Sequence, residues 1–263
     1  MERRIYVDSP VFSTFPDFHL FCVIARNLPS AGALDEKKKE EIEKDLKKAN
    51  LKARQWITSD IISENEPVMV WRDAYKKFKT KKGARSSIEA LLKRVAQDKP
   101  VSSITPLVDI YNAVSLTFAV PVGGEDLDKI QGSMGLCLTK GGDAFLPIGG
   151  SEENEPTLEG EICYLDDAGA VCRCMNWRDG QRTELTDGTK DAIFLIECTQ
   201  KDLEGRSREA MEDLERRIEK YFGAKVYDFV LDASQPAVSI EPSSEEGDEK
   251  IKPQFQGRCP LKF

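Results

Sequence analysis

The stretch "CMNWRDGQRTELTDGTKDAIFLIE", residues 174–197, joins a very polar turn to an apolar strand. It ends in an apolar run at residues 192–196, which is typical of a strand buried on both faces. Its turn places seven polar or charged side chains and Trp177 within nine positions. Surface turns usually consist of Gly, Asn, Asp and Ser. Two arginines, an aromatic ring and two carboxylates therefore indicate a turn that does more than reverse the chain.

The segments around this stretch predict a mixture of strands and helices. Three of them have the pattern of buried strands or of a hairpin: residues 18–25, 161–175 and 225–232. Four others repeat apolar residues every three or four positions, which predicts amphipathic helices: residues 35–57, a segment that begins at Ser86, a segment that begins at Thr105, and residues 207–223. These elements do not alternate regularly, which favours an α+β fold with a largely antiparallel sheet packed by helices.

The composition divides the chain into a folded domain and a tail. We expect residues 1–233 to form one domain, with a strand and helices up to residue 116 and a strand-rich half at 117–233. From residue 234 onward Pro, Ser and acidic residues prevail. This composition predicts a mostly disordered tail at 234–263.

The overall charge limits the classes of partner. The chain has 263 residues and a formal net charge of -8, so its bulk charge does not attract nucleic acid, and we expect no DNA binding. A contact with RNA would require a local basic face. No apolar stretch is long enough to cross a membrane. The start of the chain lacks the apolar core of a signal peptide, so we expect a cytoplasmic protein.

The sequence offers few of the residues that common catalytic and metal sites require. Its seven cysteines include no CxxC pair, and Cys172 and Cys174 have no further Cys or His at metal spacing. We therefore expect free thiols, no metal and no cofactor. The common catalytic and phosphate-binding signatures are absent, and the one histidine, His19, adjoins an apolar strand. Any chemistry is thus expected to proceed without a histidine base.

A basic segment with interleaved aromatic residues lies at 70–87. It contains Trp71, Tyr75 and Phe78, and this composition suits contact with an RNA backbone combined with base stacking. Its basic residues are the candidates for RNA binding: Arg72, Lys76, Lys77, Lys79, Lys81, Lys82 and Arg85. A solvated loop between helices is the alternative, and the acidic charge of the whole chain favours it.

Two further motifs hold candidate ligand-binding residues. Asp109 and Asn112 are three positions apart and share one face of a helix, where they could orient a ligand or cap a neighbouring loop. Gly123 and Gly124 would let the backbone approach a ligand closely, and Glu125 follows them directly. An ordinary tight turn is the alternative interpretation of the glycine motif.

The polar turn itself could hold an anion and an amine. Arg178 and Arg182 could clamp a phosphate or a carboxylate through paired hydrogen bonds. Glu184 could accept a hydrogen bond from an amine or a water. A cluster of surface salt bridges that neutralise one another is the alternative.

Three of these motifs occur together in the order found in a known family: "TPLVDIYNAVSL", "PVGGEDLDKIQG" and "CYLDDAGAVCRCMNWRDGQRTELTDGTKDAIFLIE". Over most of its length the chain resembles the B3/B4 domain of the phenylalanine–tRNA ligase β chain. It is more similar to the freestanding B3/B4 proteins, which carry this domain without the ligase, and "WRDAY" and "RSSIEALLKRV" also fit that group. The resemblance implies a B3/B4-like fold.

In the ligase this domain is an editing module that hydrolyses tyrosine wrongly attached to the phenylalanine tRNA. The ligase loop P-L-H-A-F-D matches residues 121–126, so the resemblance places the editing histidine on Gly123 and the editing glutamate on Glu184. The missing histidine argues against tyrosine as the substrate. The motifs that attach an amino acid to tRNA are absent, so a complete ligase is not expected.

The resemblance implies a trans-editing deacylase that hydrolyses a mischarged aminoacyl-tRNA ester with a positioned water. Its catalytic residues would be Glu184, Gly123 and Gly124. Its substrate-binding residues would be Asn112, Glu125, Asn176, Trp177, Arg178, Arg182 and Thr183. The basic segment and a lysine-rich helix at 37–54 would contact the tRNA phosphates. A noncatalytic module that binds RNA or a synthetase, and a domain that binds a free amino acid, are the alternatives.

Overall fold

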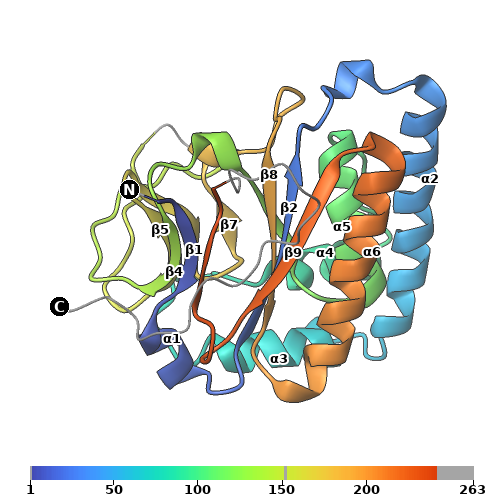
Figure 1. Cartoon of the computed structure of the whole chain (residues 1–263). Helices are drawn as coiled ribbons and strands as arrows, with labels where there is room; N and C mark the ends of the chain where they lie inside the picture. The colour runs from blue at the N-terminus through green and yellow to red at the C-terminus, as the bar shows by residue number, and fades with distance from the viewer. Residues whose placement is uncertain (1, 151–152, 242–263) are drawn as a thin grey trace.

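The computed structural model describes residues 2–150 and 153–241, which form two β-sheets and a layer of helices (Figure 1). The strands are β1 Arg4–Val7, β2 His19–Arg26, β3 Gly123–Asp126, β4 Met134–Leu138, β5 Ile162–Asp166, β6 Gly169–Arg173, β7 Arg178–Asp179, β8 Ala192–Cys198, β9 Lys225–Leu231 and β10 Ala237–Ser239. One sheet has the order β10-β1-β4-β5-β6-β7 and the other β3-β8-β2-β9. Among the described strands, β1 and β4 alone pair in parallel. The predicted α+β fold with largely antiparallel pairing is confirmed.

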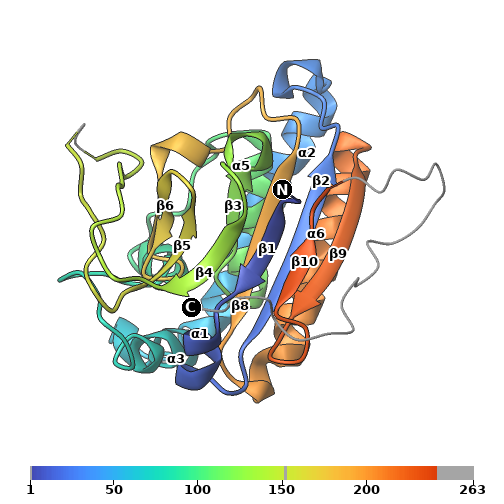
Figure 2. The same ribbon diagram turned by 60° about the vertical axis from the view of Figure 1, so that its left-hand side comes forward.

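The helices pack mainly on one side of the four-stranded sheet. They are α1 Ser9–Thr14, α2 Glu36–Ala53, α3 Glu66–Ala74, α4 Ser87–Ala96, α5 Pro106–Phe118 and α6 Glu204–Phe222. Helices α5 and α6 cover one face of this sheet, with α2 packed against α5, and the six-stranded sheet lies against the other face (Figures 1 and 2). The four-stranded sheet is therefore the middle layer. Its central strands β2 and β8 are buried on both faces, whereas its edge strand β9 is partly exposed.

Local sequence signals set the ends of several helices. The side chains of Ser86 and Thr105 accept hydrogen bonds from the backbone of the first turns of α4 and α5, as N-cap residues do. Pro106 then occupies the first turn of α5, where a missing N–H costs nothing. Gly223 ends α6 with a φ of 62°, a left-handed conformation that glycine adopts without strain.

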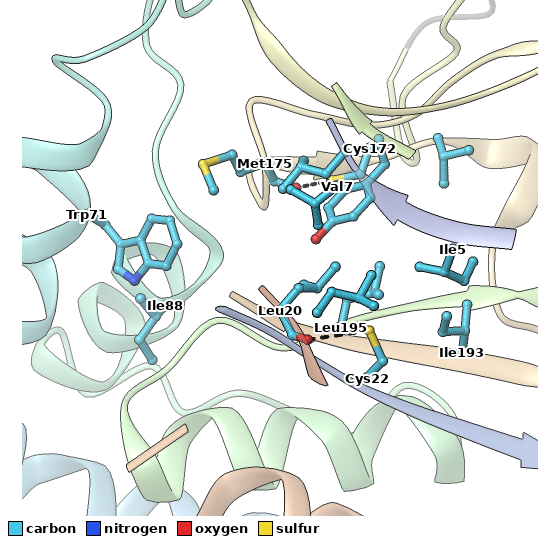
Figure 3. Close-up of a cluster of buried hydrophobic side chains, with 14 of the residues drawn as sticks. Ile5, Val7, Leu20, Cys22, Trp71, Ile88, Cys172, Met175, Ile193 and Leu195 are labelled. Carbon is cyan, nitrogen blue, oxygen red and sulfur yellow. Dashed lines mark hydrogen bonds between the residues drawn. The ribbon is translucent and has the colours of Figure 1, made fainter. Parts of the chain in front are cut away.

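Strand β8 shows how the middle layer separates two cores. Ile193 and Leu195 pack between the two sheets, while Phe194 and Ile196 pack against the helices, because successive side chains of a strand point to opposite faces. Figure 3 shows the core between the sheets, with Leu195 on one side and Met175 on the other. Trp71 and Ile88, from α3 and α4, belong to the same core.

The folded region extends beyond the boundary expected at residue 233. Strand β10 pairs antiparallel with β1, and Val238 lies opposite Ile5. The rest of the expected tail, residues 242–263, lies outside the described residues. Within the described part, no helix combines the length and the apolar character needed to span a membrane.

Candidate functional site

A small cavity lies between the two sheets, beneath the polar turn of residues 174–184. Its volume is about 30 Å³. Strands β3 and β8 form one wall and strands β5, β6 and β7 the other, with the start of α4 and the turn closing it. The lining residues are Ser87, Val122, Gly123, Glu125, Tyr164, Cys172, Met175, Asn176, Asp179, Leu195 and Glu197. The structure thus brings the 121–128 loop and the 174–197 stretch together at one place.

The pleat of β3 decides which of its residues reach the cavity. Gly123 and Glu125 lie two positions apart and line it together. Gly124 points to the opposite face of β3, where a Cβ would meet the side chains of Leu185 and Phe194 at 2.8 and 3.0 Å. A Cβ at Gly123 would meet nothing within 4 Å. The first glycine therefore leaves the cavity open, and the second allows close packing on the other face.

Glu125 carries a carboxyl oxygen that is buried without a partner. The residue is 1% exposed, and its Oε2 forms no hydrogen bond with any described residue. Burial raises the pKa of Glu125 well above its usual range, and the nearby charge of Asp179 raises it further. Burying an oxygen without a hydrogen-bond partner costs free energy, so this carboxyl could accept a hydrogen bond from a bound donor or hold a cation.

Two more carboxyl groups line the same cavity. Glu197 accepts hydrogen bonds from the Tyr164 hydroxyl at 2.8 Å and from Asn176 Nδ2 at 3.1 Å. Burial raises the pKa of Glu197 to about 7. Asp179 is partly buried, and its pKa is raised by desolvation and by the charge of Glu184. Three acids with raised pKa values in one cavity are typical of a functional site.

The raised pKa of Glu197 predicts how stability depends on pH. An unfolded glutamate titrates near about 4.3, so between that pH and about 7 the folded protein binds the proton more tightly. The free energy of unfolding should therefore fall as the pH rises through this window. The glutamine of the Glu197→Gln variant cannot ionise. The free energy of unfolding of the variant minus that of the parent should therefore rise by on the order of 3 kcal/mol from pH 4.5 to 7.5.

Urea titrations of both proteins across this range measure the effect. Glu197 is 3% exposed, so solvent screening of its charge is small. A difference in unfolding free energy that stays constant with pH would show that Glu197 titrates normally.

The turn that closes the cavity is fixed by the basic segment. Cys174 and Met175 both have left-handed backbone conformations, with φ of 49° and 63°. The Tyr75 hydroxyl donates to the Cys174 carbonyl oxygen at 2.8 Å and to Asn176 Oδ1 at 3.2 Å. The backbone N–H of Ser87 donates to the carbonyl oxygen of Asn176 at 3.0 Å. The segment at 70–87 therefore adjoins the cavity directly.

The arginines of the polar turn lie outside the cavity wall. Arg182 makes a two-pronged salt bridge to Asp166 at 2.7 and 2.8 Å and also donates to the Lys129 carbonyl oxygen, which ties the turn to the β5–β6 hairpin. Arg178 is exposed, and its guanidinium lies 5.6 Å from the ring centroid of Trp177. Trp177 follows Asn176 at the edge of the site and also has Lys81 5.9 Å from its ring.

Three other residues singled out from the sequence do not line the cavity, although two of them, Thr183 and Glu184, lie near it. Glu184 is partly buried, and its charge raises the pKa of Asp179. Thr183 is buried near Glu125 and counters the rise in that residue's pKa. Asn112 is buried on α5. Gly123, Glu125 and Asn176 are the predicted site residues that form the wall.

Several lining residues had no place in the sequence-based site. Tyr164 and Cys172 belong to a hairpin whose pattern indicates only an ordinary core. Asp179 lies in the polar turn, but only its neighbours were predicted to contact a ligand. Glu197 carried a usable signal, because a carboxylate ends the otherwise apolar run of β8 and is 3% exposed. A charge that stays buried in this way needs a partner or a function.

The basic segment is only partly neutralised. Arg72 and Arg85 both pair with Glu89, which is 2% exposed. Lys76 pairs with Asp73, and Lys81 with Glu155. The remaining cations make no ion pair with a described residue: Lys77, Lys79 and Lys82.

The lysines of α2, unlike those of the basic segment, are mostly paired with acids. Lys39, Lys44, Lys47 and Lys48 each pair with an acid of the same helix. These pairs cancel much of the charge that the lysine-rich helix would offer to phosphates.

The described residues contain no group of three His, Cys, Asp or Glu side chains placed to hold a metal ion. The cysteines of this part of the chain are free thiols, most of them buried.

The fold and its cavity define an α+β domain in which acids from both sheets meet under a polar turn. The family model of the B3/4 domain matches residues 70–234, more than half of the chain, so the chain belongs to the B3/4 domain family.

The chain is also similar to two known proteins. The phenylalanine–tRNA ligase beta subunit of Nocardia farcinica is 30% identical over 95 residues, which are 36% of this chain and 11% of that protein. The chain thus matches only a small part of that relative's length. An N-terminal fragment of the phenylalanyl-tRNA synthetase beta subunit from Pyrococcus horikoshii superposes with a TM-score of 0.46 and 12% identity, covering 86% of this chain and 53% of that one.

Proposed function

We propose that the protein is a trans-editing deacylase, which hydrolyses the ester of a mischarged aminoacyl-tRNA in the cavity between the sheets. The observation that carries this proposal is the buried Oε2 atom of Glu125 on the cavity wall, which has no hydrogen-bond partner among the described residues. The α-ammonium group of an aminoacyl ester can donate hydrogen bonds to this carboxyl group and serve as its counter-ion. The match to a tRNA ligase subunit supports tRNA as the carrier of the ester.

The acids of the cavity suit hydrolysis by a positioned water. The water oxygen bonds to the ester carbon while a carboxylate accepts the water's proton, and the bond to the ribose oxygen then breaks. A protonated carboxyl can donate a proton to that leaving oxygen, and a group with a pKa of about 7, such as Glu197, serves either role at neutral pH. Gly123 brings bare backbone to the wall, where a peptide N–H can stabilise the oxyanion.

Glu125 would thus take the role of the editing glutamate, which the resemblance placed on Glu184. Glu125 lines the cavity, whereas Glu184 acts on it through its charge near Asp179. The exposed lysines beside the cavity would contact tRNA phosphates, and Trp177, Arg178 and Asn176 would border the aminoacyl end.

A screen of tRNAs charged with different amino acids tests the proposal. Release of at least one amino acid, above the rate without protein, is the expected result. Binding of charged tRNA without any release would make the protein a noncatalytic RNA-binding module. Affinity for a free amino acid without affinity for tRNA would make it an amino-acid-binding domain.

The unpaired lysines give a prediction for tRNA affinity. Replacing Lys77, Lys79 and Lys82 together by glutamine should weaken binding and flatten its salt dependence, by about 0.7–0.9 in the log–log slope for each phosphate that is no longer neutralised. The matched control replaces Lys44, Lys47 and Lys48, which already pair with acids of α2, and should change the slope little. If the first variant kept the parent slope, the basic segment would be an ordinary solvated loop.

A further inference from the structure

The cavity also limits which amino acid the site accepts. Building on the proposed deacylase, we infer that the substrate class is an ester of a small amino acid with a free α-amine, whose side chain is no larger than a methyl or hydroxymethyl group.

The size of the cavity is the first argument. Its volume of about 30 Å³ is far below the roughly 150 Å³ of a cavity that binds benzene in a protein core. A phenyl or phenol side chain therefore has no room unless the walls move. A methyl group adds a single heavy atom beyond the α-carbon.

The rigidity of the walls is the second argument. Met175 is fully buried, and its backbone N–H donates to the Ile162 carbonyl oxygen at 2.7 Å. Leu195 lies in the middle of β8, paired with β2 on one side and with Gly123 on the other. The two side chains come from opposite walls of the core between the sheets (Figure 3). Tyr164 is fixed by its hydrogen bond to Glu197. Walls packed in this way move little to accommodate a larger side chain of the substrate.

The polarity of the cavity is the third argument. Glu125, Asp179 and Glu197 each place a carboxyl group on the wall, so they can hold the α-ammonium group and accept a hydrogen bond from a serine-like hydroxyl. A long apolar side chain would bring hydrocarbon against these carboxyl groups, which costs free energy because their oxygens would be left without hydrogen-bond partners.

Adenosine derivatives that carry the amino acid through a 3′-amide in place of the ester test this inference, because they bind without being hydrolysed. Calorimetric titration should show binding of the alanyl and seryl derivatives, with the tyrosyl derivative weaker by on the order of a hundredfold. Equal affinity for the tyrosyl derivative, or no affinity for the alanyl and seryl ones, would overturn the inference.

The same experiment keeps the two proposals apart. If the alanyl derivative binds selectively but no ester is hydrolysed, the size limit stands and the deacylase proposal fails. If a tyrosyl ester is hydrolysed as fast as an alanyl ester, the deacylase proposal stands and the size limit fails.

Conservative wall variants give a second readout. Leu195→Val shortens a side chain that faces the cavity, so the 2-aminobutyryl derivative, one methylene longer than alanyl, should gain affinity relative to the alanyl derivative by about tenfold. Ile196→Val removes the same amount of buried hydrocarbon on the helix-facing side of β8 and should leave this ratio unchanged. An equal ratio in both variants would show that Leu195 does not set the size of the site.

Discussion

Replacing Glu125 by glutamine should slow ester hydrolysis about a hundredfold or more, because loss of one positioned charged group at a reacting centre commonly costs that much. The amide keeps the size of the side chain but offers no charge to the substrate ammonium group. The tRNA body would still be held by the lysines of the basic segment, so its affinity should change by much less. Single-turnover deacylation and a binding titration of the same variant measure the two effects separately.

Two matched variants complete this experiment. Glu184→Gln removes a charge of the same kind that lies near the cavity without lining it, so its effect on the rate should be clearly smaller. His19→Ala should leave the rate nearly unchanged, because His19 begins β2 and its ring contacts the Asp17 carbonyl oxygen away from the site. A larger loss in Glu184→Gln than in Glu125→Gln would return the catalytic role to Glu184.

Replacing Glu161 by glutamine should lower the free energy of unfolding by about 3–5 kcal/mol. Arg173 is fully buried and donates to both carboxylate oxygens of Glu161, at 2.6 and 3.0 Å. It donates also to the Glu155 carbonyl oxygen at 2.8 Å. Without the carboxylate, a buried guanidinium would keep its charge without a counter-charge. Loss of this ion pair should also make the end of β6 more mobile, and the turn over the cavity begins there.

The exposed pair of Glu43 and Lys47 supplies the control for this prediction. Its atoms lie 3.7 Å apart on α2, and both side chains are at least half exposed. Glu43→Gln should therefore cost less than about 1 kcal/mol. Urea denaturation of both variants at neutral pH gives the comparison, and equal small losses would show that the Arg173–Glu161 pair contributes little to stability.

Much of the fold follows from local patterns. Apolar spacing and the N-cap residues Ser86 and Thr105 predicted α4 and α5, and the apolar run of β8 predicted a buried strand. Strand β1 has no such signal, because it is four residues long with only Ile5 and Val7 buried. Its position, between β4 and the distant β10, depends on pairing across most of the chain.

The site was only partly predictable for a related reason. Gly123 and Glu125 stood out because two glycines let the backbone approach a ligand closely and an acid follows them directly. Asn176 stood out because the turn is so polar. The roles of Tyr164 and Glu197 depend on two sheets facing each other, which no local pattern encodes. Arg182 resembled an anion clamp, but Asp166, from the hairpin, accepts hydrogen bonds from both of its terminal nitrogens.

The central claim is that the acidic cavity holds the α-ammonium group of an aminoacyl ester while the ester is hydrolysed. The most direct test uses the mischarged tRNA from which the protein releases its amino acid fastest. Its single-turnover rate is compared with that of the same tRNA after acetylation of the amino group, which removes the positive charge and keeps the ester. Acetylation is predicted to lower the rate about a hundredfold. Equal rates for the two esters, or no release from any charged tRNA, would contradict the claim.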